Sequence, residues 1–333
     1  MRIRDTHIRP FLFLSLLLVG LINACTDYQH PDFEPMLIGA PNDEGLAIYL
    51  NTDSVLRAAE SIKPVKRRLD SLLTWTDRIN AFNGEIAYEY AEAANLLAIE
   101  YGKDFSRAIA LYYKALLKGR WQTVGEGINI AISEAKISKN LINASNNLPW
   151  EIRINSLLGN LYFRNRRFKK SQIDSAKHYL ALQESLLERA QLSEKEIAYF
   201  YGYYFKDLAL INEDAGAIDK AIASHQASIQ AFEKSEDETV LGIAWRALGI
   251  FYSDQMANDV EVYFRKSIEA FQKGIEIIEK SNNTTLLAET YYFLSASYFN
   301  YFYETDDLDA YHKSLDLARK KLELRAKKCI PDL

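Results

Sequence analysis

Apolar residues follow three patterns along the 333-residue chain. Residues 11–22 form a run of twelve that is apolar apart from Ser15 and Gly20. Residues 26–50 contain three prolines and two glycines, at spacings that interrupt any helical period. From about residue 53 onward, long stretches lack both residue types, and such stretches favour helix over strand. The chain is therefore predicted to comprise a short apolar segment, a tether and a large helical region.

The first apolar run has the features of a secretory signal. Three arginines precede it, and twelve residues are too few to span a bilayer, which takes about 20. The run leads into Leu-Ile-Asn-Ala-Cys at positions 21–25, which resembles the lipobox of bacterial lipoproteins. The resemblance implies cleavage after Ala24, acylation of Cys25 and stable anchoring by more than one acyl chain. The alternative is an ordinary signal peptide followed by a chance cysteine.

One segment of the helical region carries a repeat signature. Trp245, Leu248, Gly249 and Tyr252 form the pattern Trp-x-x-Leu-Gly-x-x-Tyr, which resembles the first helix of the tetratricopeptide repeat. Partial copies of this pattern occur at 158–162, 205–209 and 292–299, and a degenerate copy lies near 115–119. The resemblance implies a series of helix hairpins.

Small residues in the second helices support the repeat independently. They recur at intervals of 45, 45, 46 and 47 residues, at Ala131, Ala176, Ala221, Ser267 and Ser314. Two helices approach closely only where small side chains meet, and each hairpin must cover its apolar face with the next. The family's usual period is about 34 residues, so longer helices and loops are expected here. The predicted fold is all-α, a right-handed superhelical array of antiparallel helix hairpins.

These patterns divide the chain into four parts. We predict a signal peptide at 1–24, the acylated cysteine and a flexible tether at 25–51, capping helices at 52–103 and five hairpins at 104–333. The hairpins are expected at about 104–147, 150–190, 193–234, 237–280 and 283–328. Pro64 should kink or split a helix near 53–77. Ser193 with Glu196, and Ser235 with Glu238, have the spacing of capping boxes.

Composition and motifs exclude several classes of function. A net charge of −5 and a pI near 5.7 give no basic footprint for nucleic acid. The two cysteines, Cys25 and Cys329, form no zinc-spaced cluster. His225 lies four residues after Ala221, where the repeat expects a packing residue, so it is interpreted as structural. No catalytic motif is found, and we predict a protein without enzymatic activity, cofactor or metal.

Aromatic residues crowd into two segments, 199–205 and 291–303. Consecutive positions surround a helix, so these side chains cannot all face one core. Two interpretations are open. The rings pack between neighbouring hairpins, or they form a stacking surface for a peptide or a sugar.

The family resemblance also implies a groove lined by the first helices. The positions that point into it correspond to Tyr113, Arg120, Arg153, Asn160, Tyr203, Lys206, Arg246 and Phe293. Four of these residues are cationic and none is acidic, and relatives use such side chains to clamp a peptide's carboxylates. We therefore hypothesise a groove for an acidic or C-terminal peptide segment. The candidate binding residues are Arg120, Arg153, Asn160, Tyr203, Lys206 and Arg246.

Together these observations predict a non-catalytic protein-interaction module. Its partner would be a protein or peptide, and its lipid anchor would hold it in the cell envelope, on the periplasmic side of the outer membrane. One alternative is a periplasmic regulatory or sensory module acting through a separate signalling protein, since repeats of this length resemble the sensory regions of certain membrane histidine kinases. The other is a glycan-capturing lipoprotein, although such relatives are much longer and add a large ligand domain.

Overall fold

The computed structural model describes residues 57, 59–80, 84–121, 126–165, 172–281 and 283–329. Cys25, the predicted signal peptide and the predicted tether lie outside these residues. All the helices described below belong to one unit, Ala58–Leu333. None of them is both long and apolar enough to cross a membrane.

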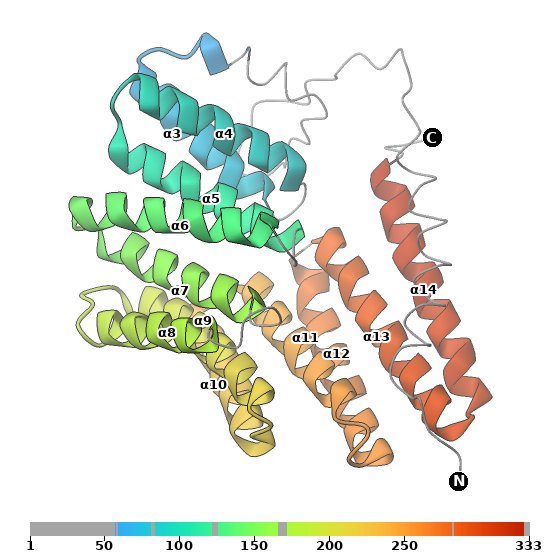
Figure 1. Cartoon of the computed structure of the whole chain (residues 1–333). Helices are drawn as coiled ribbons and strands as arrows, with labels where there is room; N and C mark the ends of the chain where they lie inside the picture. Colours follow the sequence, from blue (N-terminus) through green and yellow to red (C-terminus); the bar gives the residue numbers. More distant parts are fainter. Residues whose placement is uncertain are drawn as a thin grey trace. The chain divides into compact units, whose positions relative to one another are not determined.

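The described residues form helices joined by turns, with no strand among them. The helices, labelled as in Figure 1, are α3 Val65–Ile79, α4 Gly84–Glu100, α5 Asp104–Trp121, α6 Glu126–Ser145, α7 Leu148–Asn165, α8 Gln172–Glu188, α9 Glu194–Asp214, α10 Ile218–Ser235, α11 Glu238–Asp254, α12 Val260–Lys280, α13 Thr284–Thr305 and α14 Leu308–Cys329.

Consecutive helices pack as antiparallel pairs, and each pair packs on the next (Figure 1). The odd-numbered helices are the first helices of the hairpins, and several contact each other directly: α3 with α5, α5 with α7, α7 with α9, and α11 with α13. The prediction of an all-α array of helix hairpins is confirmed.

The small residues that carried this prediction lie where helices approach closely. Ala131, Ala176, Ala221, Ser267 and Ser314 are all buried, one in each even-numbered helix from α6 to α14. The Ser267 hydroxyl donates to the backbone oxygen of Gly249 on the preceding helix, at 2.9 Å. Backbone carbonyls are reached in this way only where no large side chain intervenes, so the small-residue period sets the spacing within each hairpin.

Three predicted local features can be compared with the helix ends. Pro64 does separate two helical segments, because α3 begins at Val65 with Pro64 as its N-cap. The Ser193–Glu196 capping box is present, with both reciprocal hydrogen bonds formed.

The second predicted capping box, Ser235–Glu238, is wrong. Ser235 is the last residue of α10, and its hydroxyl donates to the Phe232 oxygen. Glu236 then adopts a left-handed conformation with φ of 58°. Asp237 caps α11 instead, its carboxylate accepting from the backbone N–H groups of the next turn. Only Glu236 and Asp237 lie between the two helices, so the cap is Asp237.

His225 is a structural residue, as predicted. Its side chain is buried on α10, and its Nε2 lies 2.6 Å from the Glu213 carboxylate on α9. The ring also contacts Phe251 of α11, with 5.4 Å between ring centres. The histidine therefore joins two neighbouring hairpins.

Candidate functional site

The six candidate groove residues all lie on first helices. Arg120 ends α5, Arg153 and Asn160 lie on α7, Tyr203 and Lys206 on α9, and Arg246 on α11. Most of them contact the first helix of a neighbouring hairpin. These contacts determine which side chains remain available to a ligand.

Two of the four cations meet an acid. The Arg246 guanidinium lies 2.8 Å from the Glu289 carboxylate of α13 and stacks on the Phe293 ring at 5.7 Å. The Lys206 ammonium lies 3.9 Å from the Asp207 carboxylate and 4.8 Å from the Tyr203 ring. The surface is therefore less cationic than a count of the groove positions indicated, because Glu289 and Asp207 were not among those positions.

Arg120 makes a contact that fixes the end of a helix. Its Nη1 donates to the backbone oxygen of Asn80, the C-cap of α3, at 3.0 Å. Arg164, which sequence reasoning missed, does the same one hairpin later by donating to the Gly119 oxygen of α5 at 2.6 Å. Cations near the carbonyl ends of helices are favoured electrostatically. Both arginines thus tie one first helix to the end of the preceding one.

Arg153 differs from the other three cations. Its guanidinium lies over three rings: Trp150 at 5.4 Å, Phe200 at 5.6 Å and Tyr199 at 5.7 Å. Within the described part of the chain this group, which is half-buried, makes no ion pair and no hydrogen bond. A guanidinium packed on rings keeps its N–H groups available for a carboxylate, which it can bind through two parallel hydrogen bonds.

Half-buried side chains around Arg153 continue across three hairpins. Tyr112 of α5 meets Trp150 of α7 edge to face at 5.3 Å, and Tyr199 meets Tyr203 on α9 at 5.1 Å. We call Tyr112, Trp150, Arg153, Tyr199 and Tyr203 the aromatic strip. Burial raises the pKa of Tyr112 and of Tyr203, so both hydroxyls stay protonated near neutral pH.

Some rings of the two aromatic runs therefore pack between helices, and others are partly exposed at the surface. Within 199–205, Phe200 and Tyr204 are buried, whereas Tyr199 and Tyr203 are partly exposed. In the second run, the Tyr301 ring stacks on Phe264 at 3.9 Å, and its hydroxyl donates to Glu261 at 2.6 Å. Many of these rings pack against neighbouring helices, and the strip extends across the first helices of three hairpins.

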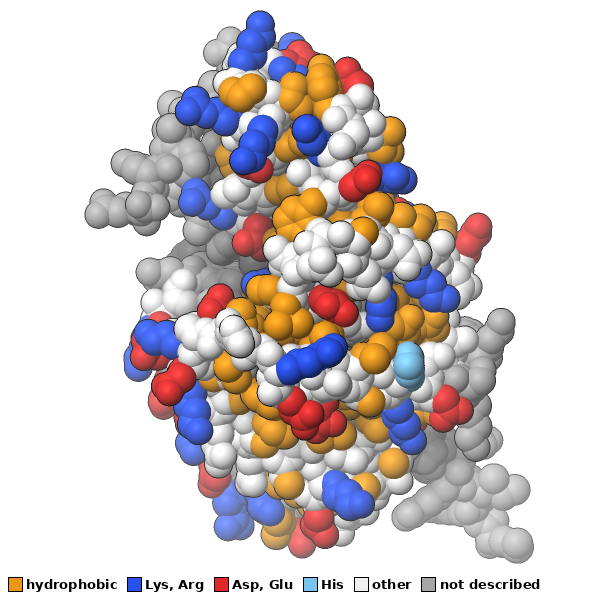
Figure 2. Space-filling view, turned by 90° about the vertical axis from the view of Figure 1, so that its left-hand side faces the viewer, with side chains coloured by type: hydrophobic (Ala, Val, Ile, Leu, Met, Phe, Trp, Pro, Cys, Tyr) orange, Lys and Arg blue, Asp and Glu red, His pale blue; other side chains and the backbone are white. Residues whose placement is uncertain are grey.

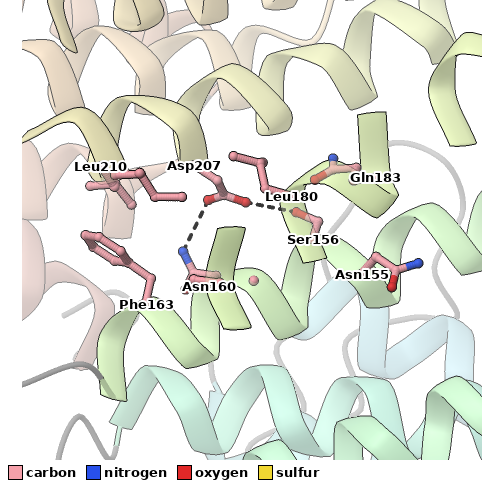
Figure 3. Close-up of a pocket in the computed structure, with 11 residues that line it drawn as sticks. Asn155, Ser156, Asn160, Phe163, Leu180, Gln183, Asp207 and Leu210 are labelled. Atoms are coloured by element: carbon pink, nitrogen blue, oxygen red, sulfur yellow. Dashed lines mark hydrogen bonds between the residues drawn. The ribbon is translucent and has the colours of Figure 1, made fainter. Parts of the chain in front are cut away.

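A polar pocket lies between α7, α8 and α9 (Figure 3). Its polar lining comprises Asn155, Ser156, Asn160, Gln183 and Asp207, and the rest is apolar. Asp207 accepts from the Ser156 hydroxyl at 3.1 Å and from the Asn160 amide at 3.3 Å. Sequence reasoning identified Asn160 but missed Asp207 and Gln183, because no spacing rule marks them.

Asp207 is a buried carboxyl group, and burial raises its pKa. The nearby Lys206 ammonium and the hydrogen bonds from Asn160 and Ser156 act in the opposite direction. Asp207 thus holds two candidate groove residues, Asn160 and Lys206, in place.

The outer surface shows no large field of one sign where Figure 2 displays it. On that face of the described residues, cationic and anionic side chains are interspersed among exposed apolar ones. The same residues contain no group of three His, Cys, Asp or Glu side chains placed to hold a metal ion.

Comparisons with known proteins add little to this geometry. No protein-family model and no curated protein matches the sequence. One similar solved structure is the crystal structure of BtubC (BKLC) from P. vanneervenii, with a TM-score of 0.48 and 16% sequence identity. The similarity covers 80% of this chain and 94% of that chain.

Proposed function

We propose that this protein is a non-catalytic, tetratricopeptide-repeat-like module that binds a partner polypeptide across the first helices of its hairpins. The observation that carries the proposal is the aromatic strip. Trp, Tyr and Arg are the residues most enriched among those that dominate binding energy at protein interfaces. Here they are partly exposed on three consecutive hairpins, next to one another.

Arg153 is the proposed anchor for the partner. Because the described structure gives its guanidinium no ion pair, a carboxylate of the partner can bind it without displacing one. Asp77 acts on the guanidinium through its charge but forms no ion pair with it. Lys206 and Arg246 are already paired with Asp207 and Glu289, so they are expected to contribute less. Of the four cationic groove residues, Arg153 is therefore the one that we expect to bind a carboxylate of the partner.

Crosslinking in the cell envelope tests the location of this surface. A photo-reactive phenylalanine replaces Tyr112 or Tyr203 in the strip, and Tyr101 or Tyr303 as controls. The control positions are more exposed, at 46% and 55%, so exposure alone favours them. We expect a discrete protein adduct from the strip positions only. Adducts from the controls alone, or from none of the four positions, would contradict the proposal.

We further propose that a lipid on Cys25 holds the module at a membrane of the cell envelope, on the periplasmic side of the outer membrane. The proposal rests on the sequence at 21–25. Anchoring confines the module and a membrane-associated partner to one surface, which raises their effective concentration. We expect the variant Cys25→Ala to lose incorporation of labelled fatty acid and to leave the membrane fraction, whereas Cys329→Ala keeps both. Labelling of Cys25→Ala would rule out lipidation at this residue.

A further inference from the structure

The polar pocket contains a buried oxygen atom that lacks a hydrogen-bond partner. Gln183 of α8 is fully buried, and its Oε1 accepts no hydrogen bond in the described structure. Buried carbonyl oxygens are paired in the great majority of proteins, because an unpaired one has lost its hydration without compensation. Gln183 lies on the pocket wall, across from Phe163 (Figure 3).

The orientation of the Gln183 amide is determined by its neighbour. Its Nε2 donates to the backbone oxygen of Phe200 at 3.4 Å. A flipped amide would bring two oxygen acceptors face to face at that distance, which is unfavourable. The amide oxygen therefore points away from the Phe200 oxygen, on a side chain that lines the pocket.

A second acceptor in the same pocket has unused capacity. The Asp207 carboxylate can accept about four hydrogen bonds. In the described structure it accepts one each from Ser156 and Asn160, both longer than 3.0 Å, and has the Lys206 ammonium at 3.9 Å. Gln183 and Asp207 thus line the same small pocket, and a ligand that serves both acceptors must donate two hydrogen bonds.

The size and charge of the pocket identify that ligand. The volume open to the centre of a water molecule is about 10 Å³, which is roughly the room that one water needs. Lys206 already balances the charge of Asp207, so a neutral donor is preferred over a cation. Leu180, Leu210 and Ile211 are among the apolar residues that line the rest of the pocket.

We propose that one internal water molecule binds in this pocket and donates to both Gln183 Oε1 and the Asp207 carboxylate. The water joins α8, in one hairpin, to α9 in the next, and gives each of two buried groups one more hydrogen bond. It also holds the carboxylate that positions Asn160 and Lys206. The inference does not depend on the proposed binding of a polypeptide.

A high-resolution crystal structure of the protein tests the site directly. We expect density for one water within hydrogen-bonding distance of Gln183 Oε1 and Asp207. A flipped amide that donates to Asp207, an unfilled pocket, or a monovalent cation revealed by anomalous scattering after a thallium soak would each overturn the proposal.

A measurement in solution compares a variant that loses the Gln183 amide with a control variant of the same pocket. Magnetic relaxation dispersion of ¹⁷O counts long-lived internal waters, and we expect Gln183→Met to have one fewer than the wild type. Leu210→Met lines the same pocket but changes no polar group, so it should retain the wild-type count. An unchanged count in Gln183→Met would contradict the proposed bridge. If that variant fails to fold, the wild-type crystal structure still decides the question.

Discussion

The hairpins α7/α8 and α11/α12 place a glycine at the same position of the repeat and surround it differently. In α11/α12, a Cβ on Gly249 would lie 3.0–3.1 Å from three atoms of the Phe271 ring. In α7/α8, the nearest atom to a Cβ on Gly159 would be the Ala176 oxygen, at 3.6 Å. Phe271 follows Ser267 by four residues, and Leu180 follows Ala176 by the same interval.

The comparison shows that one helix spacing can give a filled or a polar interior. The buried phenylalanine occupies the space beside Gly249 completely. The smaller Leu180 leaves room beside Gly159, and Asp207 and Gln183 line that room. Small residues set how closely the two helices approach. The large residue one turn later determines whether the space between the helices is filled or is lined by polar side chains.

The largest expected effect is the loss of the filled interior. Phe271→Ala removes a fully buried ring that no neighbour can replace, and we expect it to lower the free energy of unfolding by about 3–5 kcal/mol. Leu180→Ala should cost less, because the adjoining pocket already reduces its contacts. Urea unfolding followed by circular dichroism measures both. Equal losses would show that the two hairpins are packed alike.

The two glycines should respond differently to replacement by alanine. Gly249→Ala forces a methyl group against the buried Phe271 ring, so we expect a loss of about 1–3 kcal/mol. Gly159→Ala meets only ordinary contacts, and it should be neutral or stabilise the helix by up to about 1 kcal/mol. Melting temperatures of the two variants, measured side by side, give the sign. A destabilised Gly159→Ala would refute the difference in packing.

A smaller effect is expected from the hydroxyl in the filled hairpin. Ser267 donates to the Gly249 oxygen and lies 2.8 Å from the Ser297 hydroxyl, and all three residues are buried. Ser267→Ala leaves Ser297 without this partner, so we expect a loss of about 1–2 kcal/mol. The double variant Ser267→Ala with Ser297→Ala should recover part of it. A double variant as unstable as the sum of both singles would show that the hydroxyls are not coupled.

The smallest effect concerns pH at the polar pocket. Burial raises the pKa of Asp207 above its value in the unfolded chain, so the folded state binds the proton more readily. Stability should therefore rise as the pH falls from neutral toward the unfolded value, near 4. Asp207→Asn removes this pH-dependent contribution to stability. Lys206, Asn160 and Ser156 lower the pKa of Asp207 and so partly offset the effect of burial in the wild type.

The measurement is the slope of unfolding free energy against pH. Asp254, whose pKa burial raises to about 6, contributes to the slope in both proteins. The difference between the wild type and Asp207→Asn is thus the relevant quantity. We expect the wild type to gain more stability on acidification, and an identical slope would mean that the folded protein leaves the titration of Asp207 unchanged.

The sequence predicted the fold because the small-residue period is a local pattern with one structural cause. It predicted the Ser193 cap for the same reason, but the cap at Asp237 depends on the left-handed residue that ends the preceding helix. Glu289 was missed because it reaches Arg246 from 43 residues away. Gln183 was missed because its unpaired oxygen matters only where the packing leaves a space.

The proposed interaction surface depends most on Arg153. The affinity of the crosslinked partner for Arg153→Met tests it, with Arg265→Met on the exposed side of α12 as the matched loss of one arginine. A desolvated arginine at the centre of an interface is commonly worth about 2 kcal/mol or more, so we expect Kd to rise at least about tenfold. Arg265→Met should bind as the wild type does. Equal affinity of both variants would contradict the assignment of the aromatic strip as the binding surface.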